Sequence, residues 1–363
     1  FLGLIFSLCS QAETIVLWDV GAGKLEEVLI SKGYALNEVV DLQIRSTIDA
    51  RDFVTMNRKL TKLESLDIRF ATIVEYTGTD GPWPMPLPET YPAGEVPKLA
   101  FGPNAMMGQT VGKTTLKSVQ LGQASIGMMA FQACENLETV VFNTSVKEIG
   151  QSAFSKCTSL TNIALPTSIT TIQMNAFAQS NNLETFVFES PASITKLESG
   201  NYSSPKLSSF TIPASVTEVA AGEQGAFSAF KGTLQVEEGS QYFAVEGGIL
   251  YDKYLTKLIQ CPPGVTAVTI PESVLSIQPY AFKGVSVAAP LTIPNKVQES
   301  GRNAFDANAF TAINIDPLSD LKTIRTNAFR GCNAVTSITL PVGIQTIEGY
   351  AFQIAGLTDI YIY

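Results

Sequence analysis

The sequence predicts a β-rich solenoid, because a short phrase returns along its 363 residues at a nearly constant interval. The most regular part of this phrase is the dipeptide Ala-Phe, which recurs every 23 or 24 residues in two stretches of the chain. Its copies begin at Ala130, Ala153 and Ala176, and again at Ala281, Ala304, Ala328 and Ala351. A unit of this length cannot bury its own apolar face, so successive units must stack into one continuous core.

Each unit begins with a strand signal of the form L-x-x-I-x-L, as at Leu160, Ile163 and Leu165. The fourth and sixth positions share one face of the strand, which indicates a single buried side. The following proline, Pro166 in this unit, ends the strand because it has no N–H group to donate. A second short extended stretch follows. We expect Ala-Phe to close the unit through a single helical or 3₁₀ turn, with the phenylalanine between the two strand layers.

Small polar residues occupy the outward positions of the predicted first strands, where a parallel stack would align them across one long face. The preference of such residues for strands explains this composition on structural grounds. A broad contact surface for proteins or glycans explains it functionally. The outward residues are Ser118, Gln120, Thr139, Asn162, Thr185, Ser209, Thr211, Asn314, Ser337 and Thr339.

The full pattern, L-x-x-I-x-L-P-x-S-(V/I)-T-x-I-x-x-x-A-F-x-x-C, resembles the BspA-like leucine-rich-repeat family of bacterial surface proteins over residues 99–363. The resemblance implies a leucine-rich-repeat solenoid, and roles such as adhesion to extracellular-matrix proteins or aggregation with other cells. Two departures break the pattern. Gly200-Asn201-Tyr202 stands where Ala-Phe is expected, and residues 221–225 lengthen the repeat that starts at Leu207. We expect the stack to bend or bulge at these places.

Residues 13–98 differ from the repeats and resemble the N-terminal cap of the same family, a small α/β element. Helices are predicted at residues 23–32 and 49–59, and strands at residues 39–44 and 63–68.

Two excursions interrupt the regular pattern. Residues 78–103 contain seven prolines, and we expect a surface loop there rather than a strand or helix. Residues 233–264 are predicted to contain a hairpin that turns near Glu246-Gly247-Gly248.

The two ends of the sequence suggest export and a longer natural chain. Apolar residues 2–8 precede Ser10-Gln11-Ala12, which has the small residues expected before a signal-peptidase cleavage site. We therefore expect residues 1–12 to be the remnant of a secretory signal peptide. Leu8 before Cys9 argues against a lipoprotein anchor. Because the sequence stops on a strand of the repeat phrase, we expect the array to be truncated at its C-terminus.

The composition argues against several classes of function. The 33 acidic residues exceed the 24 basic ones, and a net charge of −9 does not favour binding to nucleic acid. The sequence has no histidine, which removes the commonest general base and zinc ligand. No run of 18 apolar residues predicts a transmembrane span. We expect no catalytic, cofactor-binding or metal-binding residue, and the repeats by themselves assign no binding residue.

Two local patterns have a chemical alternative. Residues 108–113, between Gly108 and Lys113, resemble a phosphate-binding loop but have three residues between the glycines where that loop has four. A connector into the first repeat explains them better.

Three cysteines share the position three residues after the repeat phenylalanine, namely Cys134, Cys157 and Cys332. Cys134 and Cys157 could form a disulfide in an exported protein. Ser180 fills the same position in another repeat, which favours a small, half-buried slot and free thiols.

Aromatic residues in the two excursions are candidate anchors for a partner, or supports for their own loops: Trp83, Tyr91, Tyr242, Tyr251 and Tyr254. Our leading hypothesis is a secreted or cell-surface monomer that recognises extracellular proteins or glycans and is not an enzyme. One alternative is a glycan-handling accessory protein or glycosidase, which needs two carboxylates about 5–10 Å apart across a cleft. The other is a structural spacer for a missing C-terminal module.

Overall fold

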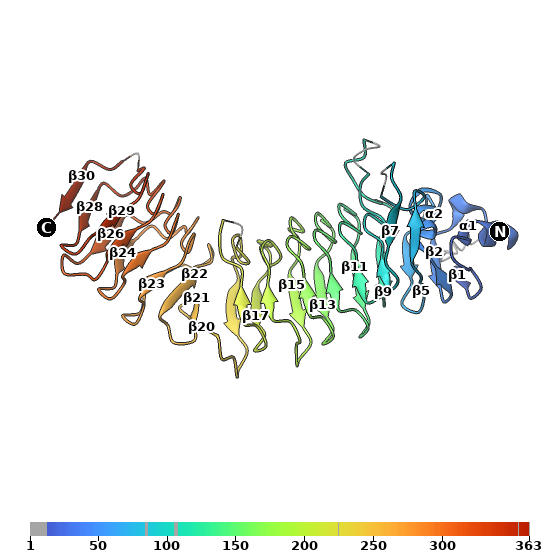
Figure 1. The fold of residues 1–363 in the computed structure, drawn as a ribbon, viewed down its shortest axis with the longest axis horizontal. Helices are drawn as coiled ribbons and strands as arrows, with labels where there is room; N and C mark the ends of the chain where they lie inside the picture. The colour runs from blue at the N-terminus through green and yellow to red at the C-terminus, as the bar shows by residue number, and fades with distance from the viewer. Residues whose placement is uncertain (1–12, 84–85, 105–107, 224, 355, 363) are drawn as a thin grey trace, which may run out of the picture. The chain divides into compact units, whose positions relative to one another are not determined.

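A computed structural model describes residues 13–363 apart from residues 84–85, 105–107, 224, 355 and 363. The chain divides into two compact units, Phe1–Val146 and Lys147–Tyr363. Each unit is a stack of coils, and most coils contribute a longer first strand and a shorter second strand (Figure 1). The predicted β-solenoid is therefore confirmed. The predicted signal remnant, residues 1–12, lies outside the described residues.

In the first unit, the first strands form one parallel sheet in the order β1-β2-β4-β9-β11. Because β4 pairs with both β2 and β9, the predicted cap and the first predicted repeats share one ladder. These strands are β1 (Thr14–Leu17), β2 (Asp41–Ile44), β4 (Ser65–Asp67), β9 (Ser118–Leu121) and β11 (Thr139–Phe142). The short second strands pair as β3 (Thr47–Ile48) with β5 (Thr72–Ile73), and β8 (Glu95–Val96) with β10 (Ser125–Ile126).

The two α-helices of the first unit lie where the sequence predicts them, and a 3₁₀ turn that was not predicted follows the first. They are α1 (Leu25–Ser31), the 3₁₀ turn η1 (Leu36–Glu38) and α2 (Ala50–Arg58). The buried side chain of Asp52 accepts hydrogen bonds from the backbone N–H groups of Asp49 and Leu25, each at 2.9 Å. One carboxylate thus satisfies free N–H groups at the starts of both helices, although its burial raises its pKa.

The proline-rich excursion contains strands, so the prediction of a plain loop over residues 78–103 is wrong. β6 (Tyr76–Gly78) and β7 (Glu89–Tyr91) form an antiparallel hairpin. β7 fits between Pro88 and Pro92, so all three of its residues keep an N–H group to donate. The prolines limit the length of the strand but do not prevent it.

The second unit repeats the arrangement of first and second strands. The first strands are β13 (Asn162–Leu165), β15 (Thr185–Phe188), β17 (Ser209–Ile212), β19 (Thr233–Val236), β24 (Pro290–Ile293), β26 (Ala312–Ile315), β28 (Ser337–Leu340) and β30 (Asp359–Ile362). The second strands are β12 (Glu148–Ile149), β14 (Thr171–Ile172), β16 (Lys196–Leu197), β18 (Glu218–Val219), β23 (Ser276–Ile277), β25 (Glu299–Ser300), β27 (Thr323–Ile324) and β29 (Thr346–Ile347). The first-strand ladder is continuous from β24 to β30 but is broken between β15 and β17.

The second excursion is a hairpin that merges with the second-strand ladder. β20 (Phe243–Glu246) pairs antiparallel with β21 (Ile249–Asp252), and the chain turns at Gly247 and Gly248. Both glycines have positive φ, 58° and 80°, as a two-residue hairpin turn requires. β22 (Lys257–Gln260) then pairs antiparallel with β21 and parallel with β23.

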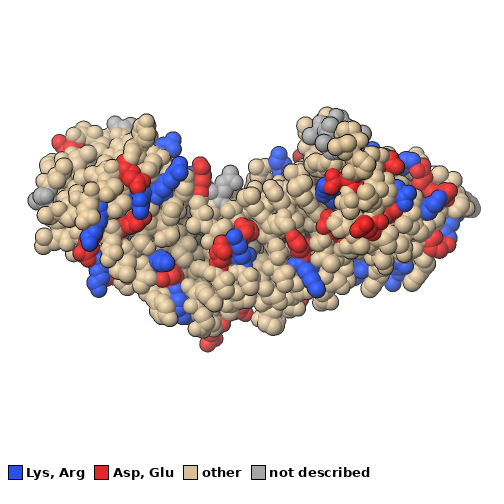
Figure 2. All heavy atoms as spheres, viewed as in Figure 1, with Lys and Arg blue, Asp and Glu red and all other residues tan. Residues whose placement is uncertain are grey.

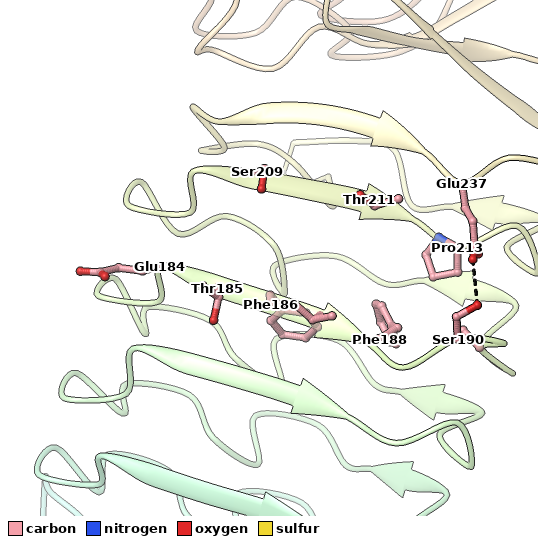
Figure 3. A pocket seen from close by; sticks show the side chains of 11 residues that line it. Glu184, Thr185, Phe186, Phe188, Ser190, Ser209, Thr211, Pro213 and Glu237 are labelled. Atoms are coloured by element: carbon pink, nitrogen blue, oxygen red, sulfur yellow. Dashed lines mark hydrogen bonds between the residues drawn. The ribbon is translucent and has the colours of Figure 1, made fainter.

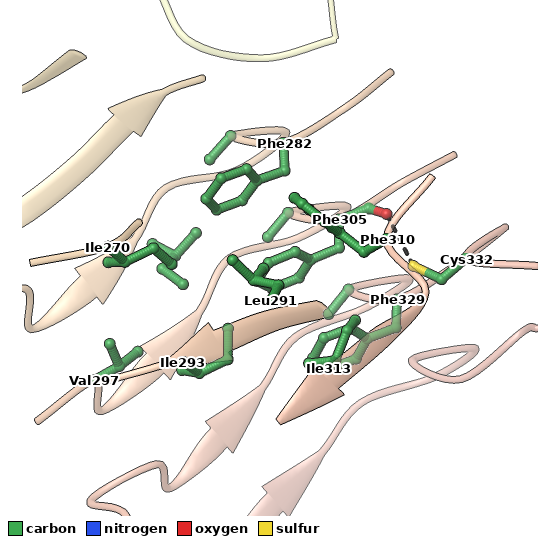
Figure 4. Packing of buried hydrophobic residues seen from close by; sticks show 14 of the residues in the cluster. Ile270, Phe282, Leu291, Ile293, Val297, Phe305, Phe310, Ile313, Phe329 and Cys332 are labelled. Carbon is green, nitrogen blue, oxygen red and sulfur yellow. Dashed lines mark hydrogen bonds between the residues drawn. The ribbon is translucent and has the colours of Figure 1, made fainter. Parts of the chain in front are cut away.

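The repeat alanines and phenylalanines form the core between the strand layers. Phe282, Phe305 and Phe329 stack in sequence, with ring centroids 5.1 and 4.8 Å apart and nearly parallel planes (Figure 4). The N–H group of Phe282 donates to the carbonyl of Ala304 in the next coil at 2.7 Å. Ala304 is fully buried. Alanine is therefore found where neighbouring backbones approach closely, as predicted.

The turn at each Ala-Phe differs from the predicted helical or 3₁₀ turn. A residue of positive φ precedes the dipeptide, such as Asn303 at 54° and Asn327 at 56°. The Asp306 N–H group then donates to the Asn303 carbonyl at 3.1 Å, which closes a β-turn. A left-handed residue interrupts the right-handed path of a helix, so the chain turns back within one coil without forming one.

Four further Ala-Phe dipeptides lie off the 23-residue interval, at Ala100, Ala226, Ala229 and Ala309. Phe101 of Ala100-Phe101 stacks on Phe131 at 5.2 Å between ring centroids, and Phe227 of Ala226-Phe227 lies 5.8 Å from the ring of Tyr202. Inserted segments displace these two copies from the interval. The dipeptide alone does not single them out, because it occurs at Ala229 and Ala309 as well.

Candidate interaction surface

Most of the predicted outward positions of the first strands are exposed, whereas Ser118, Gln120 and Thr339 are half-buried. β11, β13 and β17 each alternate exposed and buried residues along their whole length. Outward side chains of neighbouring strands can also form hydrogen bonds with each other. The Thr185 hydroxyl donates to the amide oxygen of Asn162 at 2.6 Å. On the face that Figure 2 shows, acidic and basic side chains are interspersed among a majority of uncharged residues. The outward face is thus a polar surface of low charge density.

A groove of about 190 Å³ opens in this face of the second unit, where the ladder breaks between β15 and β17 (Figure 3). Its apolar lining includes Val187, which is 54% exposed, and the half-buried Phe188. Its polar lining includes Thr185, Ser209 and Thr211. The groove therefore brings apolar area to the surface of an otherwise polar face.

Aromatic rings pack edge to face beneath the groove. Phe186 meets Tyr202 edge to face, with centroids 5.1 Å apart and an interplanar angle of 80°. Phe210 meets Phe227 in the same manner at 5.4 Å. These contacts replace the parallel ring stack of Phe282, Phe305 and Phe329 in the part of the chain where β15 and β17 do not pair.

Two carboxylates lie at opposite ends of the groove. The Glu237 side chain accepts from the Ser190 hydroxyl at 3.0 Å and from the Ala214 N–H at 2.9 Å, so loops of two other coils hold it. Glu184 precedes β15, whereas Glu237 follows β19 (Figure 3). A four-residue strand spans about 13 Å, which exceeds the separation of about 5–10 Å that glycoside hydrolysis uses.

The five predicted aromatic anchors fall into two groups. Tyr242 and Tyr254 are exposed and Trp83 is partly exposed, so all three can contact a partner. Tyr91 and Tyr251 are buried, which fits the alternative that they support their own loops and not the role of exposed anchors. The Tyr91 hydroxyl accepts the Trp83 N–H at 2.9 Å, which fixes the proline-rich hairpin from inside.

Lys113 has a structural role in the segment that resembles a phosphate-binding loop. Its buried ammonium group donates to the carbonyls of Asn57 at 3.1 Å and Leu60 at 2.8 Å. These carbonyls lie at the C-terminal end of α2, where a helix leaves carbonyl groups without partners. Burial lowers the pKa of Lys113 to about 8. The ammonium group joins α2 to the first repeats and is turned away from any phosphate in solvent.

The four described cysteines, Cys134, Cys157, Cys261 and Cys332, are buried thiols outside any disulfide, as predicted for the three in the slot that follows the repeat phenylalanine. The Cys332 thiol donates to the Phe305 carbonyl at 3.1 Å, and the Ser180 hydroxyl donates to the Phe154 carbonyl at 2.9 Å. Thiol and hydroxyl therefore serve the same purpose in the slot. Burial raises the pKa of Cys332 to about 12, which keeps it an unreactive thiol.

Searches for other chemistry give two negative findings. Among the described residues, no group of three or more acidic or cysteine side chains is placed to hold a metal ion. Within the same residues, every helix is too short to cross a membrane.

Comparison with known proteins identifies the repeats. The model of a family described as the BspA type leucine-rich repeat region matches residues 110–232 and 260–363, in six copies. Comparison with curated proteins gives no match.

Three solved structures are similar to this chain. The pneumococcal vaccine antigen PcpA has a TM-score of 0.65 and 22% identity, over 76% of this chain and 68% of that one. A leucine-rich cell surface protein from Faecalibacterium prausnitzii has a TM-score of 0.54 and 24% identity, over 76% and 84%. A leucine-rich repeat protein from Eubacterium ventriosum has a TM-score of 0.54 and 22% identity, over 68% and 73%. These likenesses support the solenoid fold.

Proposed function

Because the chain belongs to the BspA-type leucine-rich repeat proteins, we propose that it is a secreted or cell-surface protein that attaches to extracellular macromolecules, chiefly proteins, without catalysis. Stacked repeats present extended surfaces, which such proteins use for binding. One similar structure is described as a cell surface protein and another as a vaccine antigen, which supports an extracellular location. Adhesion to a host or microbial surface is the specific role that we propose.

The groove between β15 and β17 is the observation that carries this proposal. An apolar centre, Val187 and Phe188, lies within a polar rim that includes Thr185 and Thr211. This arrangement is typical of protein interfaces.

A binding screen with a matched pair of variants tests this proposal. The purified chain would be screened on arrays of extracellular-matrix proteins and glycans, followed by Val187→Lys and Ala164→Lys. Ala164 lies opposite Val187 in the β13–β15 register and is also exposed, but does not line the groove. We expect Val187→Lys to weaken binding to a captured protein at least tenfold and Ala164→Lys to change it less than threefold. No specific binding, or equal losses, would contradict the proposal.

The proposed location is tested separately by fractionating the organism that produces the protein. We expect the protein in the medium or accessible to protease on intact cells. Protein found wholly in the cytosol, with residues 1–12 retained, would contradict export.

A further inference from the structure

An arginine lies between two exposed aromatic rings in the first unit. Trp18 directly follows β1, and Arg45 directly follows β2. The parallel register places Leu17 opposite Ile44, so Trp18 and Arg45 are neighbours at the same end of the sheet. Phe70 follows β4, the next strand of that sheet.

The three side chains form a layered cluster. The guanidinium carbon of Arg45 lies 5.2 Å from the centre of the Trp18 ring and 4.9 Å from the centre of the Phe70 ring. Both distances allow cation–π attraction, which holds the guanidinium in place. The rings are nevertheless 67% and 57% exposed. The two rings therefore form an exposed apolar patch on either side of the guanidinium, and such patches can mark an interaction site.

Arg45 differs from its neighbour Arg69 in lacking an acidic partner. Arg69 also lies over Phe70, at 5.6 Å, but it forms an ion pair with Asp67 at 2.9 Å. The Arg45 guanidinium makes no ion pair or hydrogen bond with any described residue, and its Nε atom is buried without a partner. Its terminal nitrogens are not buried. An unpaired cation is thus presented between two apolar surfaces, in a chain whose net charge is −9.

We propose that Trp18, Arg45 and Phe70 form a separate contact site, which binds a carboxylate side chain flanked by apolar residues on a protein partner. A guanidinium can bind a carboxylate through two parallel hydrogen bonds. Tryptophan and arginine are the residues most enriched among those that dominate binding at protein interfaces. Because both rings already hold the arginine, little side-chain freedom is lost on binding. This inference rests on the proposed function only in that the partner is a protein.

The polar groups around the cluster favour a protein over an acidic sugar. A saccharide site needs several converging polar groups, but the neighbouring side chains already bond within the chain. The Ser46 hydroxyl accepts the Val20 N–H at 2.9 Å, and Asp67 accepts hydrogen bonds from Gln43 at 2.6 Å as well as from Arg69. One free guanidinium and two rings remain, which suits an acidic residue beside apolar ones.

The test uses the full chain and immobilised peptides in which Asp or Glu is flanked by Leu, Phe or Tyr. Each peptide is paired with a copy carrying Asn or Gln in place of the acid, and sialyllactose serves as an acidic saccharide. The variants are Trp18→Ala, Arg45→Met and Arg45→Lys, with Arg302→Met as a control at an exposed arginine of the second unit. Circular dichroism and thermal melting would check that each variant is folded.

We expect the best acidic peptides to bind at least tenfold more tightly than their amide copies. Arg45→Met and Trp18→Ala should remove this preference, Arg45→Lys should weaken it by about threefold to tenfold, and Arg302→Met should leave it unchanged. The proposal is overturned if no acidic peptide is preferred, if Arg45→Met binds as the wild type does, or if only sialyllactose depends on Arg45. If the Arg45 variants bind as the wild type does but Val187→Lys weakens binding, only the proposal for the Trp18, Arg45 and Phe70 site fails. If the Arg45 variants lose the preference for acidic peptides but Val187→Lys has no effect, only the groove proposal fails.

Discussion

The regular coils over residues 276–352 and the irregular coils over residues 183–261 differ in how their aromatic rings fill the space between the strand layers. In the regular coils, Phe282, Phe305 and Phe329 stack with interplanar angles of 6° and 7°, and the first strands pair without interruption. In the irregular coils, rings meet edge to face and the first-strand ladder breaks. The groove lies in the irregular part. Departures from the repeat, rather than the repeat itself, therefore coincide with the groove between β15 and β17.

Amide side chains maintain the coil where alanine is missing. Asn201 replaces the repeat alanine, and its side-chain oxygen accepts the Phe177 N–H at 3.2 Å. Gln260 does the same for Phe227 at 3.4 Å. In regular coils, the alanine carbonyl accepts this hydrogen bond. The irregular coils therefore keep the bonding pattern while changing the spacing of the backbone.

The largest expected effect is in the regular stack. Phe305→Ala removes a fully buried ring that contacts a ring on either side, and should lower the free energy of unfolding by about 3–5 kcal/mol. Chemical denaturation would measure it. Thr292→Ala, at an exposed position of β24, is the control and should cost less than about 0.5 kcal/mol. Similar losses for both variants would mean that the inward and outward faces are wrongly assigned.

A smaller loss is expected at the amide that replaces alanine. Asn201→Ala restores the repeat residue but leaves the buried Phe177 N–H without its partner, and it removes one of the two hydrogen bonds that the Gln173 carbonyl accepts. We expect a loss of about 1–3 kcal/mol, because the Phe177 N–H is buried. The surface hydrogen bond from Asn182 to the Thr158 carbonyl provides a control, and Asn182→Ala should cost less. A stabilised Asn201→Ala would show that the backbone can close to the regular spacing.

Tyr202→Phe should have a smaller effect of the opposite sign. The Tyr202 hydroxyl is buried without a hydrogen-bond partner, so removing it should stabilise the fold by about 0.5–1 kcal/mol. The ring contacts with Phe186 and Phe210 remain. Thermal melting would detect a higher midpoint, and a lower midpoint would refute the idea that this hydroxyl only costs stability.

The smallest expected effect is a change in the pH dependence of stability, at the ion pair between Arg325 and Glu348, which directly follow the second strands β27 and β29. Hydrogen bonds from Arg325 and Thr326 lower the pKa of Glu348 from 4.5 to about 2. A lowered carboxyl pKa stabilises the fold above about pH 4.5, and this contribution disappears as the pH falls toward 2. Glu348→Gln should therefore lose less stability than the wild type between pH 5 and pH 2. The difference should shrink with added salt, because the pair is partly exposed. Parallel pH profiles would contradict the assignment.

Most of the fold follows from local sequence. The alternation in strands such as β13, the prolines that end them and the capping residue Asp49 of α2 each act within a few residues. Stacking also follows, because a 23-residue unit buries its apolar face only against a neighbouring copy. These features are short-range and periodic, so the sequence alone determines them.

Only the tertiary structure decided how the irregular segments fit. Tyr91 and Tyr251 are aromatic residues in the two excursions and could have been exposed anchors, but packing in the folded chain buries them. Whether β15 and β17 pair depends on how neighbouring coils pack, and the unpaired state of Arg45 depends on which carboxylates surround it. These features arise from contacts between separate strands and turns, and no local pattern specifies their geometry. Local sequence therefore specifies the scaffold, and three-dimensional packing sets which of its side chains stay exposed.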